Sequence, residues 1–487
     1  MRLTVINHKY HYEMEKLVRL FLPNEKIEVV REKIGGDGLY TEIGDEIVVD
    51  FKMGDYTRHE IAPLCDDNEM QMGRMVYGIF GEYTGFFPKW GVLTGVRPSK
   101  LLIATENKMG REKAEQYFYN DLLVSNEKFN LARRVADCEE KIISLSTPKS
   151  FSLYISIPFC PTRCSYCSFV SHSVQTEKAK ALVPQYVKLL SEELKITGEI
   201  AEKNKLKLES VYVGGGTPTT LSAQELENLL RAVTENFDLS ACREFTVEAG
   251  RPDTITEEKL SALKNGPVDR ISINPQTFSN EVLKTIGRCH SAEETVSAFN
   301  TARALGFDNI NMDLIAGLPG DTVSGFMNSL NIANDLDPEN ITVHTLALKR
   351  SSKLGADDMQ VTAENAKKVD AMLQYTYEKL NGKYHPYYMY RQSKSAGNLE
   401  NTGWCKENRE CLYNVFMMEE CHTILSCGGG AVTKLKAPNG SEIERVFNFK
   451  YPFEYISGFE QLIERKNRIS PFYKTYSKKE VDKNDKT

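Results

Sequence analysis

Apolar and polar residues alternate in two ways along the middle of the chain. Short runs rich in β-branched and aromatic residues predict strands, and longer amphipathic segments between them predict helices. The six predicted strands occupy residues 152–157, 210–213, 244–248, 270–274, 309–314 and 341–346. The predicted helices occupy residues 181–200, 222–237, 257–263, 292–305 and 323–336. Because regular strand–helix alternation is typical of parallel βα units, the pattern predicts an α/β fold built on an incomplete (β/α)6 barrel.

The regions before and after this pattern do not show the same regular alternation of strands and helices. Residues 1–145 are expected to form a separate N-terminal α+β module, whose role the sequence does not indicate. Residues 146–385 hold the barrel pattern, and residues 386–487 form a C-terminal extension that is expected to cover a substrate. From Tyr473 onward the chain is charged and polar, which predicts a disordered tail.

Composition narrows the class of protein. The 487 residues carry a formal net charge of −6, so bulk charge does not favour nucleic acid as a partner. No apolar run approaches the length of about 18 residues that a membrane span needs, and the N-terminus lacks the apolar core of a secretory signal. Eleven cysteines in a chain of this length fit a reducing cytosol better than a disulfide scaffold. We therefore expect a cytoplasmic protein without a membrane span.

Three cysteines in C-x3-C-x2-C spacing follow the first predicted strand directly. Cys160, Cys164 and Cys167 are close enough in one loop to converge on a single soft metal centre. Three thiolates leave one iron of a [4Fe–4S] cluster without a protein ligand, and that iron can bind a small molecule. Two other interpretations stay open: a zinc site with His172 as a fourth ligand, and cysteines that are simply buried apolar residues.

Glycine and polar residues stand at the carboxyl ends of the other predicted strands. They are Gly214, Gly215, Gly216, Glu248, Gln276, Asp313 and Ala347. Because parallel strands end at the same edge of a sheet, these residues are expected to share one rim with the cysteines. Glycines let a backbone approach a ligand closely, and Glu248 or Asp313 can accept hydrogen bonds from ammonium or hydroxyl groups. Arg288 can pair with a carboxylate through two hydrogen bonds.

These residues resemble a known family. The cysteine loop looks like that of the radical S-adenosylmethionine (SAM) superfamily. Tyr-x-x-Ile-Pro-Phe-Cys at 154–160, Gly-Gly-Gly-Thr-Pro-Thr at 214–219 and Asn-Met-Asp-Leu-Ile-Ala-Gly-Leu-Pro at 311–319 resemble the oxygen-independent coproporphyrinogen III oxidases. The similarity covers about residues 150 to 460. The stretch 90–98 and the cysteine loop look most like the HemZ branch of this group.

The resemblance implies cofactors and the residues that hold them. Cys160, Cys164 and Cys167 would hold a [4Fe–4S] cluster in a radical SAM barrel, and one or two SAM molecules would bind beside it. Contacts to the first SAM would come from Tyr154, Tyr166, Gly215, Glu248 and Val432. Contacts to a second would come from Gly216, Thr217, Gln276, Arg288, Asp313 and Ala347. Tyr154 and Glu248 would also take part in catalysis.

The implied reaction is oxidative decarboxylation of two propionates of coproporphyrinogen III to vinyl groups, which gives protoporphyrinogen IX. A tetrapyrrole substrate and a low-potential electron donor such as flavodoxin or ferredoxin would be the partners. The classical oxidase has a further cysteine two residues after the third cluster ligand, whereas this chain has Phe169. The heme chaperones of the same family also lack that cysteine. Heme binding or transfer, or another radical SAM reaction on a tetrapyrrole, therefore stay open as alternatives.

The C-terminal region contains further candidates. The aromatic run 384–391 could stack on a tetrapyrrole, with Arg391 near a propionate, or could pack on the barrel as a strand. An auxiliary cluster would need the thiols of Cys405, Cys411, Cys421 and Cys427, whose spacing matches no ferredoxin-like motif. His422 is a possible heme ligand on the chaperone interpretation.

Overall fold

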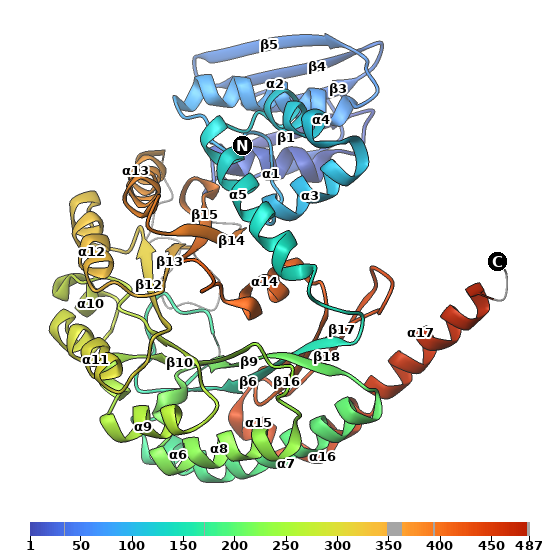
Figure 1. Cartoon of the computed structure of the whole chain (residues 1–487). Helices are drawn as coiled ribbons and strands as arrows, with labels where there is room; N and C mark the ends of the chain where they lie inside the picture. Colours follow the sequence, from blue (N-terminus) through green and yellow to red (C-terminus); the bar gives the residue numbers. More distant parts are fainter. Residues whose placement is uncertain (34, 170, 348–362, 393–394, 485–487) are drawn as a thin grey trace.

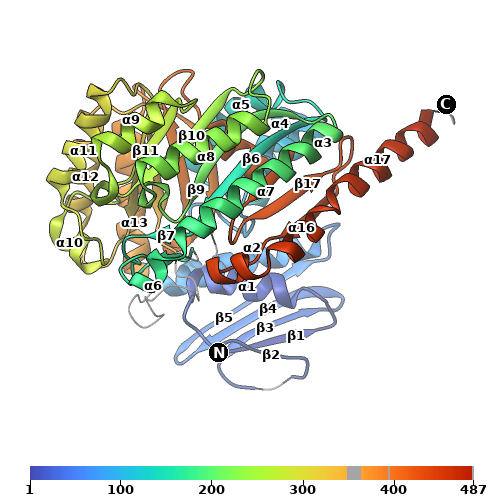
Figure 2. The same ribbon diagram turned by 90° about the horizontal axis from the view of Figure 1, so that it is seen from below.

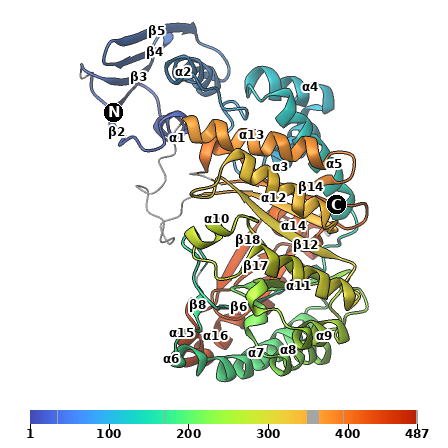
Figure 3. The same cartoon turned by 90° about the vertical axis from the view of Figure 1, so that its left-hand side faces the viewer.

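The computed structural model describes residues 1–33, 35–169, 171–347, 363–392 and 395–484. Its N-terminal sheet has the strand order β2-β1-β3-β4-β5. These strands are β1 (Arg2–Ile6), β2 (Glu28–Val30), β3 (Gly38–Ile43), β4 (Glu46–Met53) and β5 (Tyr56–Pro63). Helices α1 (His11–Phe21) and α2 (Asn68–Thr84) pack on this sheet, and their apolar side chains form a core of their own with it. Figure 3 shows this unit at one end of the molecule.

The remaining part of the expected N-terminal module packs elsewhere. Helices α3 (Pro98–Met109), α4 (Arg111–Gln116) and α5 (Asn126–Ile143) follow the sheet, with a π-helical turn at Tyr117–Asp121. Side chains such as Phe118, Leu131 and Val135 belong to the large core that also contains the barrel strands. The sequence predicted one module over 1–145, whereas the structure has a sheet unit followed by helices that join the main body.

The six predicted parallel strands are confirmed. They are β6 (Ser150–Ile157), β9 (Lys207–Gly215), β10 (Glu244–Gly250), β11 (Arg270–Ile273), β12 (Ile310–Ala316) and β13 (Asn340–Thr345). Each pairs with the next in chain order, and every pairing is parallel. Most of their residues are buried, because helices cover one face and the barrel interior lies on the other.

Helices lie on the outside of the curved sheet (Figure 1). They are α6 (Glu177–Lys180), α7 (Val183–Lys203), α8 (Ala223–Asn236), α9 (Glu257–Asn265), α10 (Asn280–Thr285), α11 (Ala292–Ala304) and α12 (Val323–Asp335). Ser222 and Ser291 start α8 and α11 with capping boxes, in which each serine and the glutamate three residues later satisfy each other's backbone amides. These helices hold the strands in the incomplete (β/α)6 barrel that the sequence predicted.

C-terminal strands extend the sheet beyond both ends of the six-strand unit. β15 (Glu400–Cys405) pairs antiparallel with β13, and β14 (His385–Arg391) pairs antiparallel with β15. β16 (Thr423–Cys427) lies parallel to β6, β17 (Val432–Lys436) pairs antiparallel with β16, and β18 (Ile443–Phe447) pairs antiparallel with β17. The described sheet therefore has eleven strands.

The other C-terminal elements are helices. They are α13 (Ala363–Leu380), α14 (Leu412–Glu419), α15 (Pro452–Ser457), α16 (Phe459–Lys466) and α17 (Ile469–Asn484). Helix α14 lies inside the curve of the sheet (Figure 1), where the Tyr413 ring stacks against Tyr154 and Tyr212. The opening of the incomplete barrel is therefore partly filled by the chain itself.

The tail differs from the prediction. Disorder was expected from Tyr473, but α17 continues to Asn484 and points away from the body of the molecule (Figure 2). Phe472 and Tyr473 are buried, and the Tyr473 hydroxyl shares a hydrogen bond of 2.5 Å with Thr423. These two buried aromatic side chains hold the first turns of α17 on the body of the molecule, and the helix continues through the polar sequence that follows. Residues 485–487, also expected to be disordered, lie outside the described residues. None of the described helices combines the length and apolar character that crossing a lipid bilayer requires.

A buried carboxylate joins the N-terminal helices to the C-terminal strands. Glu400 at the start of β15 accepts hydrogen bonds from Lys128 Nζ at 2.6 Å and from Trp90 Nε1 at 2.8 Å. All three side chains are almost completely inaccessible to solvent. Burying charges is unfavourable unless each is paired, so the integrity of this junction depends on both partners being present.

We expect Glu400→Ala to lower the free energy of unfolding by about 3 kcal/mol, because it leaves the Lys128 ammonium buried with fewer partners. The urea midpoint of the purified protein measures the effect, with Glu235→Ala on the exposed face of α8 as the control. The double variant Lys128→Met/Glu400→Gln removes the buried charge and keeps an acceptor for Trp90, so it should recover most of the loss. Equal midpoints for Glu400→Ala and Glu235→Ala would contradict this account.

Candidate functional site

The cysteine loop is folded back on the sheet. Cys160 ends the short strand β7 (Phe159–Cys160), which pairs with β8 (His172–Ser173). The amide of Ser165 donates to the carbonyl of Ile286 at 3.0 Å and fixes the middle of the loop. Cys160, Cys164 and Cys167 all line one pocket of about 370 Å³. The His172 ring instead contacts Tyr451 and Phe453 and does not line this pocket.

Arrangement and burial of the three thiols suit a cluster better than a single ion. Their sulfur atoms do not all lie within 4.8 Å of one another, whereas the ligand atoms of a tetrahedral zinc ion would. Burial raises the pKa of the Cys167 thiol to about 11, so its thiolate needs a positive partner. Arg251 Nη1 lies 3.6 Å from Cys164 Sγ, and Thr217 Oγ1 lies 3.5 Å from Cys160 Sγ. A cluster in which three irons each take one of these thiolates fits this set of donors.

The glycine turn after β9 serves the cysteine loop. A Cβ on Gly216 would lie 2.5 Å from the carbonyl oxygen of Phe159, and one on Gly215 would lie 2.8 Å from Ser156 Oγ. The amides of Gly216 and Thr217 donate to the carbonyls of Ile157 and Phe159 at 2.8 and 2.7 Å. The sequence predicted that these glycines would let the backbone approach a ligand. In the structure their missing side chains let β9 approach the start of the cysteine loop.

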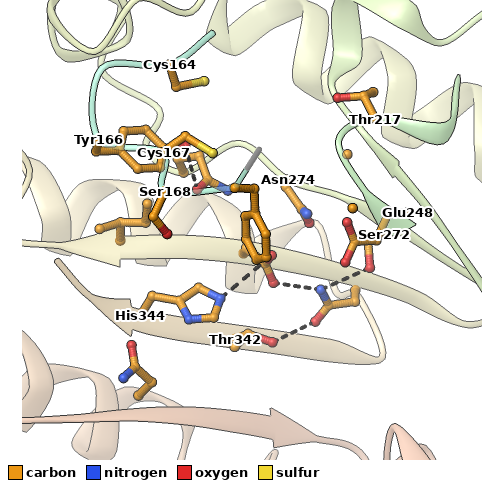
Figure 4. Close-up of a pocket in the computed structure, with 18 of the residues that line it drawn as sticks. Cys164, Tyr166, Cys167, Ser168, Thr217, Glu248, Ser272, Asn274, Thr342 and His344 are labelled. Carbon is orange, nitrogen blue, oxygen red and sulfur yellow. Dashed lines mark hydrogen bonds and ion pairs between the residues drawn. The ribbon is translucent and has the colours of Figure 1, made fainter. Parts of the chain in front are cut away.

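Two carboxylates lie across the pocket from the loop, in different environments. Figure 4 shows Glu248 on the opposite side of the pocket from Tyr166 and Cys167. Burial raises the pKa of Glu248 to about 7, although the Tyr212 hydroxyl donates to it at 2.5 Å. Burial also opposes ionisation of Asp313, but the hydrogen bond and charge of His344, together with hydrogen bonds from Asn311 and Thr342, hold the pKa of Asp313 below its usual value. The two carboxylates therefore favour different protonation states near neutral pH.

A chain of hydrogen bonds organises the wall of the pocket that includes Tyr166 of the cysteine loop. Arg288 Nη1 donates to the Asn274 carbonyl at 2.9 Å, and Nη2 donates to the Tyr166 hydroxyl at 3.1 Å. Tyr166 in turn donates to Gln276 Oε1 at 3.0 Å. Gln276 has a φ of 67°, a left-handed conformation that is uncommon for a residue with a side chain and that concentrates at functional sites. Its amide donates to the Asp313 carbonyl at 2.9 Å, which fixes this backbone beside β12.

Several buried polar atoms of the pocket have no hydrogen-bond partner among the described residues. They are Thr246 Oγ1, Asn274 Oδ1, Arg288 Nε and Gln392 Oε1. Buried polar atoms are nearly always satisfied, so this set indicates a polar ligand. The donors and acceptors present fit the amino, carboxylate and ribose groups of SAM.

Most predicted site residues come together in this pocket. Those that line it are Cys160, Cys164, Cys167, Tyr166, Gly215, Gly216, Thr217, Glu248, Gln276, Arg288, Asp313 and Ala347. Tyr154 and Val432 do not line it. Tyr154 lies on β6, and a Cβ on Gly215 would lie 3.4 Å from the Tyr154 hydroxyl. Val432 begins β17, the neighbour of β16.

Other lining residues were not anticipated. Arg251 follows the carboxyl end of β10, and His344 stands one residue before the end of β13, so the strand-end rule could have identified both. Asn414 and Met418, which enter from α14, were not anticipated either. Tyr388 and Tyr390 enter from β14 and belong to the aromatic run 384–391 that was a candidate for contact with a tetrapyrrole. Their position depends on how the C-terminal extension folds over the barrel, which local sequence does not reveal.

Two candidate residues in the C-terminal region are corrected. Arg391 does not face the pocket: its Nη1 donates to the Leu93 carbonyl at 2.7 Å, and its guanidinium lies over the Trp90 ring, so it joins two parts of the core. His422 is buried and shares a hydrogen bond of 2.8 Å with Ser152, and burial lowers its pKa to about 4. It is a core histidine and not a heme ligand.

The four C-terminal thiols do not form an auxiliary cluster. Cys411 lies beside Glu244 at the start of β10, and Cys427 lies beside Thr197 on α7. Cys405 lies 3.3 Å from His385. Within the described ranges, no group of three potential metal ligands draws on two of these four cysteines. They are distributed over separate elements because each packs locally.

Comparisons with known proteins agree with the geometry. A model of the radical SAM superfamily matches residues 154–333. The oxygen-independent coproporphyrinogen-III oxidase-like protein HemZ of Bacillus subtilis (strain 168) is 40% identical over 390 residues, which cover 79% of this chain and 77% of that protein. The chain belongs to this radical SAM family.

Two further similar proteins carry names other than HemZ. The heme chaperone HemW of Haemophilus influenzae is 30% identical over 326 residues, or 65% of this chain and 78% of that protein. A solved structure, coproporphyrinogen III oxidase (HemN) from Escherichia coli, matches with a TM-score of 0.52 at 22% identity, over 67% of this chain and 72% of that chain. The latter likeness shows the shared fold. The cofactors of this radical SAM protein are a [4Fe–4S] cluster and SAM, as the sequence predicted.

We expect Cys164→Ala to abolish assembly of the cluster, because the two remaining thiolates cannot hold it in this buried loop. Iron and sulfide content and visible absorption after anaerobic reconstitution measure the result. Cys242→Ala, which removes a partly buried thiol outside the pocket, should retain both. A Cys164→Ala protein with a wild-type iron content would contradict the ligand assignment.

We expect Glu248 to make folding stability pH-dependent. Since its pKa is raised to about 7, the folded protein keeps a proton that the unfolded chain releases between about pH 4.5 and 7. The free energy of unfolding should therefore fall as the pH rises through that interval, and it should fall less in Glu248→Gln. Urea midpoints across the interval test this, with Glu235→Gln on exposed α8 as the control. Parallel pH profiles for wild type and Glu248→Gln would refute the assigned pKa.

Proposed function

We propose that this protein is an oxygen-independent coproporphyrinogen III dehydrogenase, which converts two propionates of coproporphyrinogen III to vinyl groups. The observation that carries the proposal is that the three thiols share one continuous pocket with Glu248, Asp313 and Arg288. Membership of the family that includes HemZ supports the tetrapyrrole substrate. Carbon–hydrogen bonds next to a pyrrole ring are too strong for acid–base groups alone, so a cofactor must supply the reactive species.

When bound, the cluster and SAM together supply a 5′-deoxyadenosyl radical that can abstract a hydrogen atom. For each propionate, one hydrogen atom and one electron leave, the bond to the carboxylate carbon breaks, carbon dioxide departs and a carbon–carbon double bond forms. A one-electron acceptor has to take the electron. A low-potential donor such as flavodoxin or ferredoxin would reduce the cluster. The need for reducing conditions favours a cytoplasmic location.

The residues of the chain have positioning roles in this proposal. Arg288 is held by Asn274 and Tyr166, and its unpartnered Nε is available to a carboxylate of SAM. Ionised Asp313 can accept from an ammonium or hydroxyl group, and Glu248 can donate or accept according to its protonation state. Tyr154 lies beside Gly215, and neither Tyr154 nor Val432 lines the pocket, so we assign neither residue a direct contact with SAM. Gly216, Thr217, Gln276 and Ala347 complete the wall where a second SAM would bind.

The pocket suits a ligand with an apolar body and charged edges. Tyr388 and Tyr390 contribute aromatic faces, while Arg251, Arg270 and Arg288 contribute positive charge. Phe169 also lines the pocket, and 64% of its surface is exposed. A tetrapyrrole with carboxylate side chains matches both kinds of surface.

Heme transfer is the second candidate function. Phe169 stands where the classical oxidase has a further cysteine, and it gives the pocket mouth an apolar, non-ligating surface. The match covers 78% of the 30% identical relative named heme chaperone and 77% of the HemZ relative. Both functions would use the same cluster, so only the fate of the tetrapyrrole separates them.

An anaerobic turnover experiment separates the two functions. Reconstituted protein with SAM, reductant, an electron acceptor and coproporphyrinogen III should give protoporphyrinogen IX, carbon dioxide and methionine. Cys164→Ala should give none of these products, whereas Cys242→Ala should match the wild type. Methionine without protoporphyrinogen IX, together with stable heme binding that an acceptor protein can remove, would overturn the dehydrogenase assignment and support heme transfer.

A further inference from the structure

A second group of metal-ligating side chains lies at the opposite end of the sheet from the cysteine loop. His385 begins β14 and Cys405 ends β15, and the antiparallel register places these two residues directly opposite each other. Cys405 also pairs with Asn340, the first residue of β13. The group is therefore at the amino end of the parallel strands, while the cluster cysteines follow a carboxyl end.

Three donors from separate elements converge there. Cys138 comes from the last turns of α5, His385 from β14, and Glu410 from the loop before α14. His385 Nε2 lies 3.0 Å from Glu410 Oε1, and Cys138 Sγ lies 3.9 Å from the same oxygen. Among the described residues this is the one trio of His, Cys, Asp or Glu whose ligand atoms all lie within 4.8 Å.

The spacing fits a tetrahedral ion. Bonds of the lengths that zinc makes to sulfur, nitrogen and oxygen put neighbouring ligand atoms about 3.3 to 3.8 Å apart. The observed separations of 3.0 and 3.9 Å lie close to this range. A thiolate, an imidazole and a carboxylate together are a donor set that suits zinc and chemically similar divalent ions.

The surroundings allow an ion to enter. The side chains of His385 and Glu410 retain 33% and 19% of their exposure, and Cys138 is partly buried. Cys405 Sγ lies 3.3 Å from His385 Nε2, beside the trio. A fourth coordination position is thus available to solvent or to a second sulfur.

We propose that Cys138, His385 and Glu410 bind a zinc-class divalent ion, separate from the iron–sulfur cluster. A hydrogen-bonded pair of His385 and Glu410 would explain the contact between these two residues without a metal. It would not explain the two thiols, Cys138 and Cys405, that lie beside the pair. Binding replaces the proton of the Cys138 thiol, which leaves to solvent, with the metal. The ion would tie α5 to β14 and to the start of α14, elements that already contact one another (Figure 1).

Metal analysis of the cluster-loaded protein tests the proposal. After incubation with Zn²⁺ and removal of excess, the wild type should hold about one equivalent of zinc in addition to iron. Zinc X-ray absorption on the same sample should show sulfur and nitrogen ligands without interference from iron. Cys138→Ser and His385→Gln should each weaken zinc binding by more than about 100-fold, since even changes outside the ligand shell cost 10- to 100-fold. Cys242→Ser should retain zinc, and all variants should retain iron.

A measurement on the unaltered chain covers the case in which the variants fail to fold. Zn²⁺ should protect Cys138 from alkylation in the wild type, while exposed Cys65 should react at the same rate with and without zinc. Absence of zinc after loading, zinc retained in both ligand variants, or equal alkylation of Cys138 with and without zinc would overturn the site. Iron content and SAM cleavage report independently on the radical SAM centre, so failure here leaves the proposed function untouched.

Discussion

The close approach of β9 to the start of the cysteine loop is the constraint on which the site depends. Ile157 pairs with Gly215, and the next two amides of the glycine turn bond to carbonyls just before Cys160. This contact leaves no space for a side chain at Gly216, because a Cβ there would meet backbone oxygen. Backbone atoms cannot rotate away as a side chain can, so the position of the first cluster ligand is fixed by the sheet. The rest of the rim follows because each parallel strand ends at the same edge.

Burial then determines what charge this rim can hold. Arg251 is almost inaccessible to solvent and lies beside Cys164, while Asp253 pairs with it from the other side. A buried guanidinium is tolerated only with negative partners, and a cluster with three thiolates supplies further negative charge. Across the pocket, burial raises the pKa of Glu248, whereas at Asp313 the largest effect, burial, is outweighed by His344, Asn311 and Thr342 acting together, so the pKa is lowered. Two carboxylates of similar intrinsic acidity thus acquire different protonation states from their surroundings alone.

The six strands could be predicted from sequence because both of their faces are buried, which leaves short uninterrupted apolar runs. The rim residues could be predicted because topology, and not side-chain packing, brings them together. Arg391 could not be placed, since its partners Leu93 and Trp90 lie about 300 residues away in the chain. The start of α17 could not be predicted for a similar reason: the burial of Phe472 and Tyr473, which anchor it, is not visible in a charge-rich composition. Val432 was expected at the site from resemblance, but it begins β17 and is not among the residues that line the pocket.

The C-terminal extension does more than cover the opening of the barrel. Tyr413 on α14 stacks with Tyr154 and Tyr212 inside the sheet, and the Tyr212 hydroxyl bonds Glu248. The same extension carries Glu400, which pairs with Lys128 and Trp90 from the N-terminal region. Because β14 and β15 also provide pocket residues such as Tyr388, Tyr390 and Asn401, the N-terminal region is mechanically connected to the site without lining it.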